Sequence, residues 1–193
     1  MSKKILVILG QPQRASYGGA LAQAYAEGAR EAGAEVKELY LGDLRFNVCA
    51  TAGQPPPREL EADLVQAQES IKWAEHIVFV YPIWWGTIPA LLKGFIERIF
   101  LPGFAVNFRE NSPLWDKLLT GRSARLIVTL NTPSWIYRWY FGRPGHNTMK
   151  KTILQFCGVR PVRITEVGPI KNSTDKKRKK WLARIHEIGR RLV

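Results

Sequence analysis

The stretch YPIWWGTIPALLKGFIERIF, residues 81–100, joins an apolar strand to an amphipathic helix through a loop that carries two tryptophans. The apolar run HIVFV, residues 76–80, predicts a buried strand, and Pro82 ends its pairing because proline has no N–H to donate. Trp84 and Trp85 therefore follow the carboxyl end of a strand, the edge where open parallel sheets bind ligands. Two flat apolar rings at this edge indicate a flat ligand. The alternative is that both indoles pack beneath a neighbouring loop.

The same alternation of strand and helix runs along the whole chain. Hydrophobic periodicity predicts strands at residues 4–9, 35–41, 76–81, 124–130 and 161–167. It predicts helices at about residues 16–32, 57–73, 89–100, 144–157 and 174–192. Strands that are apolar on both faces are typical of a parallel sheet covered by helices on both sides. The pattern predicts an α/β fold: a doubly wound five-stranded parallel sheet, flavodoxin-like, with strand order 2-1-3-4-5.

Length and composition predict a single domain over residues 1–193. A chain of 193 residues with 46% apolar content buries enough surface for one core and too little for a second domain. Two cysteines and no signal peptide favour a reducing compartment, so we expect a soluble, cytoplasmic protein. The three histidines and two cysteines show no metal-ligand spacing, and we expect no metal site.

The formal net charge of +13 raises the question of an anionic partner. The densest cluster is KKRKK, residues 176–180, at the start of the last predicted helix. No zinc-finger spacing, RNP-type strand or helix-turn-helix pattern accompanies it, so we expect no nucleic-acid binding and a solvated basic face. Attraction to phosphorylated dinucleotides or to acidic lipid headgroups stays open, as does contact with a membrane.

A candidate phosphate site lies on the loop after the first strand, residues 10–18. The start of a helix presents free N–H donors and partial positive charge, Ser16 can donate a hydroxyl hydrogen bond, and Arg14 adds full charge. The loop is neither a GxGxxG fingerprint nor a Walker loop. The alternative is that Ser16 is a simple helix cap and Arg14 is solvated.

Two long connections, residues 102–123 and 131–144, interrupt the pattern. Connections of this length in a small domain are usually functional or mobile. The second is rich in aromatic residues, which we expect to cover a ligand or a partner subunit: Trp135, Tyr137, Trp139, Tyr140 and Phe141.

Together, a phosphate loop and a neighbouring loop with planar rings match the two halves of a flavin nucleotide. The segment at residues 81–100, followed by LPGFAV, resembles the flavodoxin-like NAD(P)H:quinone oxidoreductases, the family that includes DT-diaphorase and the bacterial modulator of drug activity. The resemblance covers nearly the whole chain and includes RASYGGALAQA, LRFNV and FCGVRPVRITEVGP. The strand–proline–tryptophan–PALLKG motif is its specific part.

The resemblance implies FMN, or alternatively FAD, as cofactor and NAD(P)H as hydride donor. It implies that the phosphate and ribityl chain lie among Gln11, Arg14, Ser16, Tyr17 and Gly18. It implies that the isoalloxazine is lined by Pro82, Ile83, Trp84, Trp85 and Gly86. In the family, a Thr/Gly-rich loop after the fourth strand closes over the pyrimidine side of the flavin. This chain has Leu130, Asn131, Thr132 and Pro133 there, and the resemblance makes Asn131 and Thr132 its candidate flavin contacts.

Tyr137 and His146 are the nearest candidates for the tyrosine and histidine that assist hydride transfer in the family, at a different spacing. A surface tyrosine and a helix-start histidine are the alternative. We hypothesise a ping-pong cycle in which NAD(P)H reduces the flavin and a quinone-type acceptor then takes two electrons. The resemblance also implies a homodimer. The rival hypothesis is an electron carrier, or a regulatory subunit of a membrane transport system.

Overall fold

Five parallel strands form the central sheet of the computed structural model, which describes residues 2–49 and 60–192. The strands are β1 (Lys4–Leu9), β2 (Glu35–Tyr40), β3 (His76–Pro82), β6 (Ser123–Thr129) and β7 (Val162–Val167). Their order in the sheet is β2-β1-β3-β6-β7, and every neighbouring pair is parallel. The predicted order 2-1-3-4-5 is confirmed.

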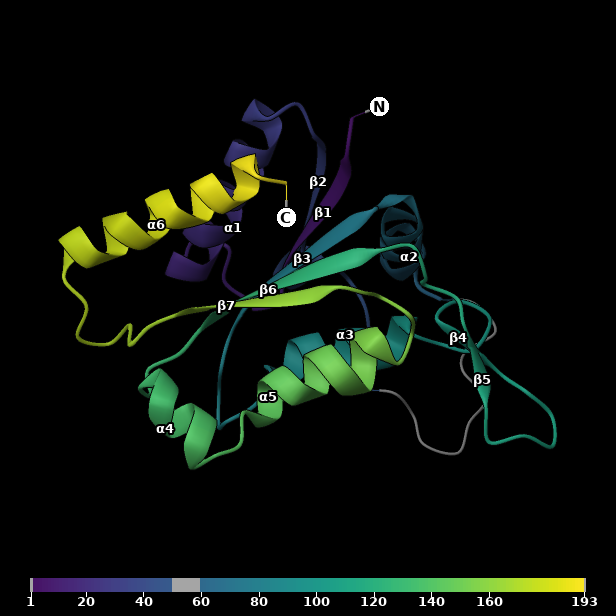
Figure 1. The fold of residues 1–193 in the computed structure, drawn as a ribbon. Helices are drawn as coiled ribbons and strands as arrows, with labels where there is room; N and C mark the ends of the chain where they lie inside the picture. The colour runs from purple at the N-terminus through teal and green to yellow at the C-terminus, as the bar shows by residue number, and fades with distance from the viewer. Residues whose placement is uncertain (1, 50–59, 193) are drawn as a thin grey trace.

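Helices cover both faces of this sheet (Figure 1). On one face lie α1 (Tyr17–Glu31) and α6 (Asp175–Arg190), which pack against each other. The other face carries α2 (Ala62–Trp73), α3 (Ala90–Ile99) and α5 (Pro144–Asn147), which continues into the π-helix η2 (Thr148–Gln155). Alternate residues of β3 enter the two cores: Val78 faces α1 and α6, whereas Phe79 faces the other helices. This two-sided burial explains why the strands are apolar throughout.

Several element boundaries differ from the sequence-based prediction. The connection 102–123 contains an antiparallel hairpin of β4 (Val106–Phe108) and β5 (Trp115–Lys117). The aromatic connection contains the helix α4 (Ser134–Trp139), and β2 ends in a short 3-10 turn, η1 (Leu41–Asp43). The predicted start of the second helix at residue 57 lies outside the described residues. Within residues 2–49 and 60–192, no helix combines the length and apolar character that crossing a bilayer requires.

Backbone hydrogen bonds hold the loops at the carboxyl edge of the sheet next to one another. Gly10 N–H donates to Val80 O at 2.8 Å, which ties the loop after β1 to β3. Ile83 N–H donates to Thr129 O at 2.7 Å, which ties the loop after β3 to β6. The loops after β1, β3 and β6 are therefore neighbours at one edge, as a parallel sheet requires.

Glycines let α1 and α6 approach at the level of the backbone. A Cβ on Gly28 would lie 2.1 Å from the carbonyl oxygen of His186, and one on Gly189 would lie 2.2 Å from that of Tyr25. No side chain fits at either position unless the helices move apart. The placement of α6 over the sheet therefore depends on these two glycines.

We predict that Gly28→Ala lowers the free energy of unfolding by about 3 kcal/mol, because backbone atoms must shift to admit the methyl group. The control is Gly33→Ala, at the end of α1, where no atom lies within 4 Å and only the positive φ of +83° opposes a side chain. That change should cost about 1 kcal/mol. Urea unfolding of the two variants measures both values. Equal costs would contradict the close packing of the two helices.

Candidate functional site

A tight turn, Trp84–Thr87, follows β3 and is called here the tryptophan turn. Trp84 and Thr87 exchange both backbone hydrogen bonds at 3.0 Å, and Trp85 and Gly86 have positive φ values of 50° and 79°. This is the geometry of a two-residue hairpin turn. The Trp84 side chain is half-exposed and Trp85 is fully exposed, at 49% and 103%. The alternative that both indoles pack beneath a neighbouring loop is therefore wrong.

The tryptophan turn also presents open backbone donors. Thr87 N–H is taken up by Trp84 O. In contrast, the N–H groups of Trp85 and Gly86 have no hydrogen-bond partner within the described part of the chain. The turn can therefore offer two N–H groups, beside two indoles, to a bound molecule.

Ser16 caps helix α1, as the simpler interpretation of the loop predicted. Its Oγ accepts the Gly19 N–H at 3.1 Å and the Gln11 Nε2–H at 2.6 Å, and its own hydroxyl donates to Gln13 O at 2.8 Å. The N–H groups of Tyr17 and Gly18 make no hydrogen bond among residues 2–49 and 60–192. Such open N–H groups at a helix start bind anions.

Gly18 and Tyr17 are fixed by different neighbours. A Cβ on Gly18 would lie 2.7 Å from Gln11 Oε1, so the amide of Gln11 lies across the helix start, in the space beside this glycine. The Tyr17 hydroxyl donates to Arg178 O at 3.0 Å, which ties the start of α1 to the start of α6. The basic cluster at residues 176–180 therefore lies near the predicted phosphate loop.

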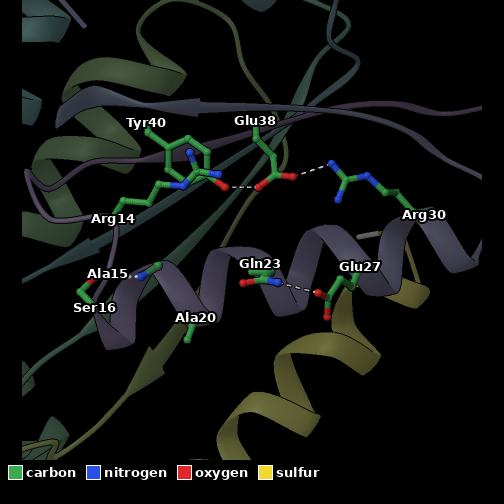
Figure 2. Close-up of a pocket in the computed structure, with 10 residues that line it drawn as sticks. Arg14, Ala15, Ser16, Ala20, Gln23, Glu27, Arg30, Glu38 and Tyr40 are labelled. Atoms are coloured by element: carbon green, nitrogen blue, oxygen red, sulfur yellow. Dashed lines mark hydrogen bonds and ion pairs between the residues drawn. The ribbon is translucent and has the colours of Figure 1, made fainter. Parts of the chain in front are cut away.

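Arg14 lies on the β2 side of its loop. Its guanidinium is 4.0 Å from the centroid of the Tyr40 ring and 3.8 Å from Asp43 Oδ2. Figure 2 shows it beside Tyr40 in a cavity of about 410 Å³, which also extends along α1. The lining residues are Arg14, Ala15, Ser16, Gly19, Ala20, Gln23, Glu27, Arg30, Glu38 and Tyr40. The cavity thus adjoins the predicted phosphate loop, whereas the tryptophan turn does not line it.

Glu38 contributes negative charge to this cavity. Burial alone would raise the pKa of Glu38, but hydrogen bonds from Tyr40 and Arg30 and the positive charge of Arg30 and Arg14 hold it below its ordinary value. Figure 2 shows the Glu38 carboxylate between Tyr40 and Arg30. Glu38 is therefore ionised at neutral pH and partly neutralises the two arginines.

Tyr137 and His146 lie together beneath the tryptophan turn. The Tyr137 hydroxyl donates to Gly86 O at 2.9 Å and accepts the Gly145 N–H at 3.0 Å. The two rings meet edge to face, with centroids 5.1 Å apart, and the exposed fractions are 1% for Tyr137 and 2% for His146. Tyr137 therefore contacts the turn from inside the protein, and His146 packs against Tyr137.

Glu166, on β7, is a partner of this pair that the sequence analysis missed. His146 Nε2 lies 2.9 Å from Glu166 Oε1, and that hydrogen bond is the main cause that holds the pKa of Glu166 below its usual range. Arg143 Nε lies 3.7 Å from the same oxygen. The sequence held a signal for this residue: the strand VRITEV carries a carboxylate near its end. A charged side chain in a strand covered by helices needs a polar partner.

The third loop follows β6 and is held to the segment after β7. Asn131 Oδ1 accepts the Lys171 N–H at 2.9 Å, and Leu130 O accepts the Ile170 N–H at 3.2 Å. A Cβ on Gly168 would lie 2.3 Å from Leu130 O, so the two segments touch through their backbones. Asn131 is exposed and Thr132 is partly exposed at this edge of the sheet.

Exposed aromatic side chains flank the tryptophan turn. Helix α4 contacts the turn through Tyr137 and Gly86, and the aromatic residues around that helix point outward. The exposed fractions are 68% for Trp135, 75% for Trp139, 82% for Tyr140 and 51% for Phe141. Exposed apolar surface of this extent marks a binding surface for a ligand or another protein chain.

The donors and rings at this edge fit a molecule with an anionic tail and a planar head. Open N–H groups at Tyr17 and Gly18 suit the tail. The indoles and the open N–H groups of Trp85 and Gly86 suit a flat ring that carries hydrogen-bond acceptors. The predicted site residues are thus brought to one edge of the sheet, with Tyr137 and His146 behind the tryptophan turn.

A family model described as a flavodoxin-like fold matches residues 3–188 of this chain. A ribosyldihydronicotinamide dehydrogenase-like protein of Penicillium crustosum is 32% identical over 152 residues, which cover 66% of this chain and 57% of that protein. NAD(P)H dehydrogenase [quinone] 1 of Rattus norvegicus is 25% identical over 194 residues, which cover 86% of this chain and 70% of that protein. The chain thus spans little more than half of the fungal relative.

Among solved structures, a putative quinone reductase from Klebsiella pneumoniae is similar, with a TM-score of 0.82 and 25% identity. The match covers 96% of this chain and 83% of that one. The resemblance recognised from residues 81–100 is confirmed by these comparisons.

We predict that Tyr137→Phe lowers the free energy of unfolding by about 1 kcal/mol, because the Gly86 carbonyl and the Gly145 N–H both lose their hydroxyl partner. The loss is moderate because Gly145 N–H also reaches Gly86 O, at 3.3 Å. Thermal unfolding measures the change. The exposed Tyr140 is the matched control, and Tyr140→Phe should leave stability within about 0.5 kcal/mol. Indistinguishable variants would contradict the role of the Tyr137 hydroxyl.

Proposed function

This chain belongs to the flavodoxin-like fold family, and we propose that it is a flavin-dependent oxidoreductase that passes electrons from NAD(P)H to quinone-type acceptors. One observation carries the proposal. The start of α1, with N–H groups that are unpaired within the described residues, and the exposed tryptophan turn lie at the same edge of the sheet. The names of the rat and Klebsiella relatives agree with this chemistry.

The fit of the residues supports a specific placement of the flavin. The N–H groups of Tyr17 and Gly18 would bind the phosphate, with Arg14 close by. The tryptophan turn would bind the ring system through the indoles and the N–H groups of Trp85 and Gly86. We propose FMN, with FAD as the alternative; when bound, the flavin supplies hydride acceptance from NAD(P)H and two-electron transfer to the acceptor.

The protein's part in this chemistry is positioning and electrostatics. Two N–H donors at the tip of the turn stabilise negative charge on a ring held against them. Their direction is set by Tyr137, whose hydroxyl holds Gly86, and by His146, which is anchored on Glu166. We therefore propose that Tyr137 and His146 act as positioning residues for the turn. Their direct participation in hydride transfer stays a prediction, as does the ping-pong order.

A homodimer is the second part of the proposal. The exposed rings of the tryptophan turn and of the α4 segment form apolar surface that a second copy would cover. Part of the flavin site would then lie at the subunit boundary. Sedimentation at micromolar concentration should give a dimer, and a monomer alone would contradict this part.

The rival function is an electron carrier or a regulatory subunit of a membrane transport system. The net charge of +13 favours docking to an acidic partner. Turnover separates the two functions. We expect the purified protein, supplied with flavin, to oxidise NAD(P)H steadily in the presence of a soluble quinone. Negligible turnover together with tight binding to a membrane partner would support the rival and remove the proposed activity.

We predict that Trp85→Ala weakens flavin binding by about tenfold or more, because a ring-sized apolar contact is lost. Fluorescence titration with FMN measures the dissociation constant. Phe108→Ala, at an exposed aromatic residue on the β4–β5 hairpin, is the control and should bind flavin as the wild type does. Ser16→Ala should weaken binding less, since it removes hydrogen bonds within the loop but no ring-sized contact. Equal affinity in the wild type and Trp85→Ala would count against the placement of the ring.

A further inference from the structure

A second polar site lies at the amino edge of the sheet, opposite the tryptophan turn. The strands β1, β3, β6 and β7 are parallel, so their first residues meet at this edge. There they enclose a cavity of about 180 Å³. Its lining residues are Lys3, His76, Ser123, Ala124, Pro161 and Arg163.

The sheet register places the polar side chains of this edge on one face. His76 pairs with Ser123 across β3 and β6, and Arg125 pairs with Arg163 across β6 and β7. These positions alternate with the side chains of the opposite core, so they share the face covered by α1 and α6. The ring of Tyr25, from α1, stacks on His76 with centroids 6.5 Å apart.

His76 is buried at this edge and only half satisfied. It is 2% exposed, and its Nδ1 lies 2.7 Å from Ser123 Oγ. Its Nε2 is buried and has no hydrogen-bond partner within the described part of the chain. A buried polar nitrogen without a partner is costly, and native proteins usually provide one as protein, water or ligand.

The charges that act on His76 are all positive. Burial, followed by the cations Lys3, Arg125 and Arg163, lowers the pKa of His76 to about 3. The imidazole is therefore neutral near pH 7. When Ser123 donates to Nδ1, the proton of the neutral ring is on Nε2, which can then donate a hydrogen bond.

The surrounding elements add further positive charge and one acidic group. Burial is the main cause that lowers the pKa of Lys3; Glu75 opposes the shift and Arg163 reinforces it. The Lys3 ammonium also donates to Leu192 O, just beyond the end of α6. From α6, Arg184 adds its charge to that of Arg125. The described groups around the cavity thus carry more positive than negative charge.

We propose that this cavity binds a tetrahedral oxyanion of the phosphate class, held by Arg163, Lys3 and the Nε2–H of His76. Arginine offers two parallel N–H donors to such an anion, and lysine adds a point charge. Arg163 and Pro161 are exposed, so the anion can enter from solvent. The source is either free phosphate or a phosphate monoester on a larger molecule. The site is independent of the proposed flavin chemistry.

Isothermal titration of the full-length protein with sodium phosphate, in a chloride buffer at constant ionic strength, tests the proposal. We expect saturable binding of one phosphate per chain. Arg163→Gln should weaken it about tenfold, because a charge-assisted hydrogen bond is lost. Arg45→Gln, at an exposed arginine that does not line the cavity, removes the same charge and should leave the affinity unchanged. Absence of binding at millimolar phosphate, or equal weakening in both variants, would overturn the proposal.

Nitrogen NMR of protein labelled at histidine gives a second readout, the chemical shifts of the ring nitrogens. A change in the overall charge of the protein alone would not alter the shift of one particular histidine. Phosphate should shift the Nε2 resonance of His76 and leave that of His186, which does not line the cavity, unchanged. Arg163→Gln should reduce the shift at a given phosphate concentration. Glycerol 2-phosphate distinguishes the two sources: the same shift indicates a monoester site, and a shift with inorganic phosphate alone indicates free phosphate. No shift of His76 with either anion would contradict the site.

Discussion

The site depends on how β3 ends. Pro82 has no N–H to donate. The next residue, Ile83, donates its N–H to Thr129 O at 2.7 Å, which extends the pairing with β6 by one residue. Beyond that bond the backbone turns back on itself at Trp85 and Gly86, both with positive φ. The two indoles are thereby held at the sheet edge instead of in the core.

What lies beneath the tryptophan turn explains why an exposed loop can be well positioned. The Tyr137 hydroxyl bridges Gly86 O and Gly145 N–H, and His146 packs against Tyr137 while bonded to Glu166 on β7. The direction of the turn is thus set by contacts that reach back to the sheet. A binding surface supported in this way loses less conformational entropy when a ligand binds.

Much of the fold could be predicted because its signals are local. Apolar runs identified β1 and β3, and the alternation of strands with helices led to the strand order. Helix α4 was predicted as a loop, since Trp135 and Trp139 are exposed and Tyr137 alone is buried, which gives no buried stripe. The stacking of Arg14 on Tyr40 and the pairing of His146 with Glu166 join residues far apart in sequence. Periodicity carries no information about such contacts.

The central claim is that the carboxyl edge of the sheet holds a flavin between the start of α1 and the tryptophan turn. The most direct test is the visible absorption spectrum of the purified protein, followed by extraction and chromatography of any bound cofactor. The account predicts flavin absorption bands and stoichiometric release of FMN, or of FAD. A colourless protein that takes up neither nucleotide on reconstitution would contradict it.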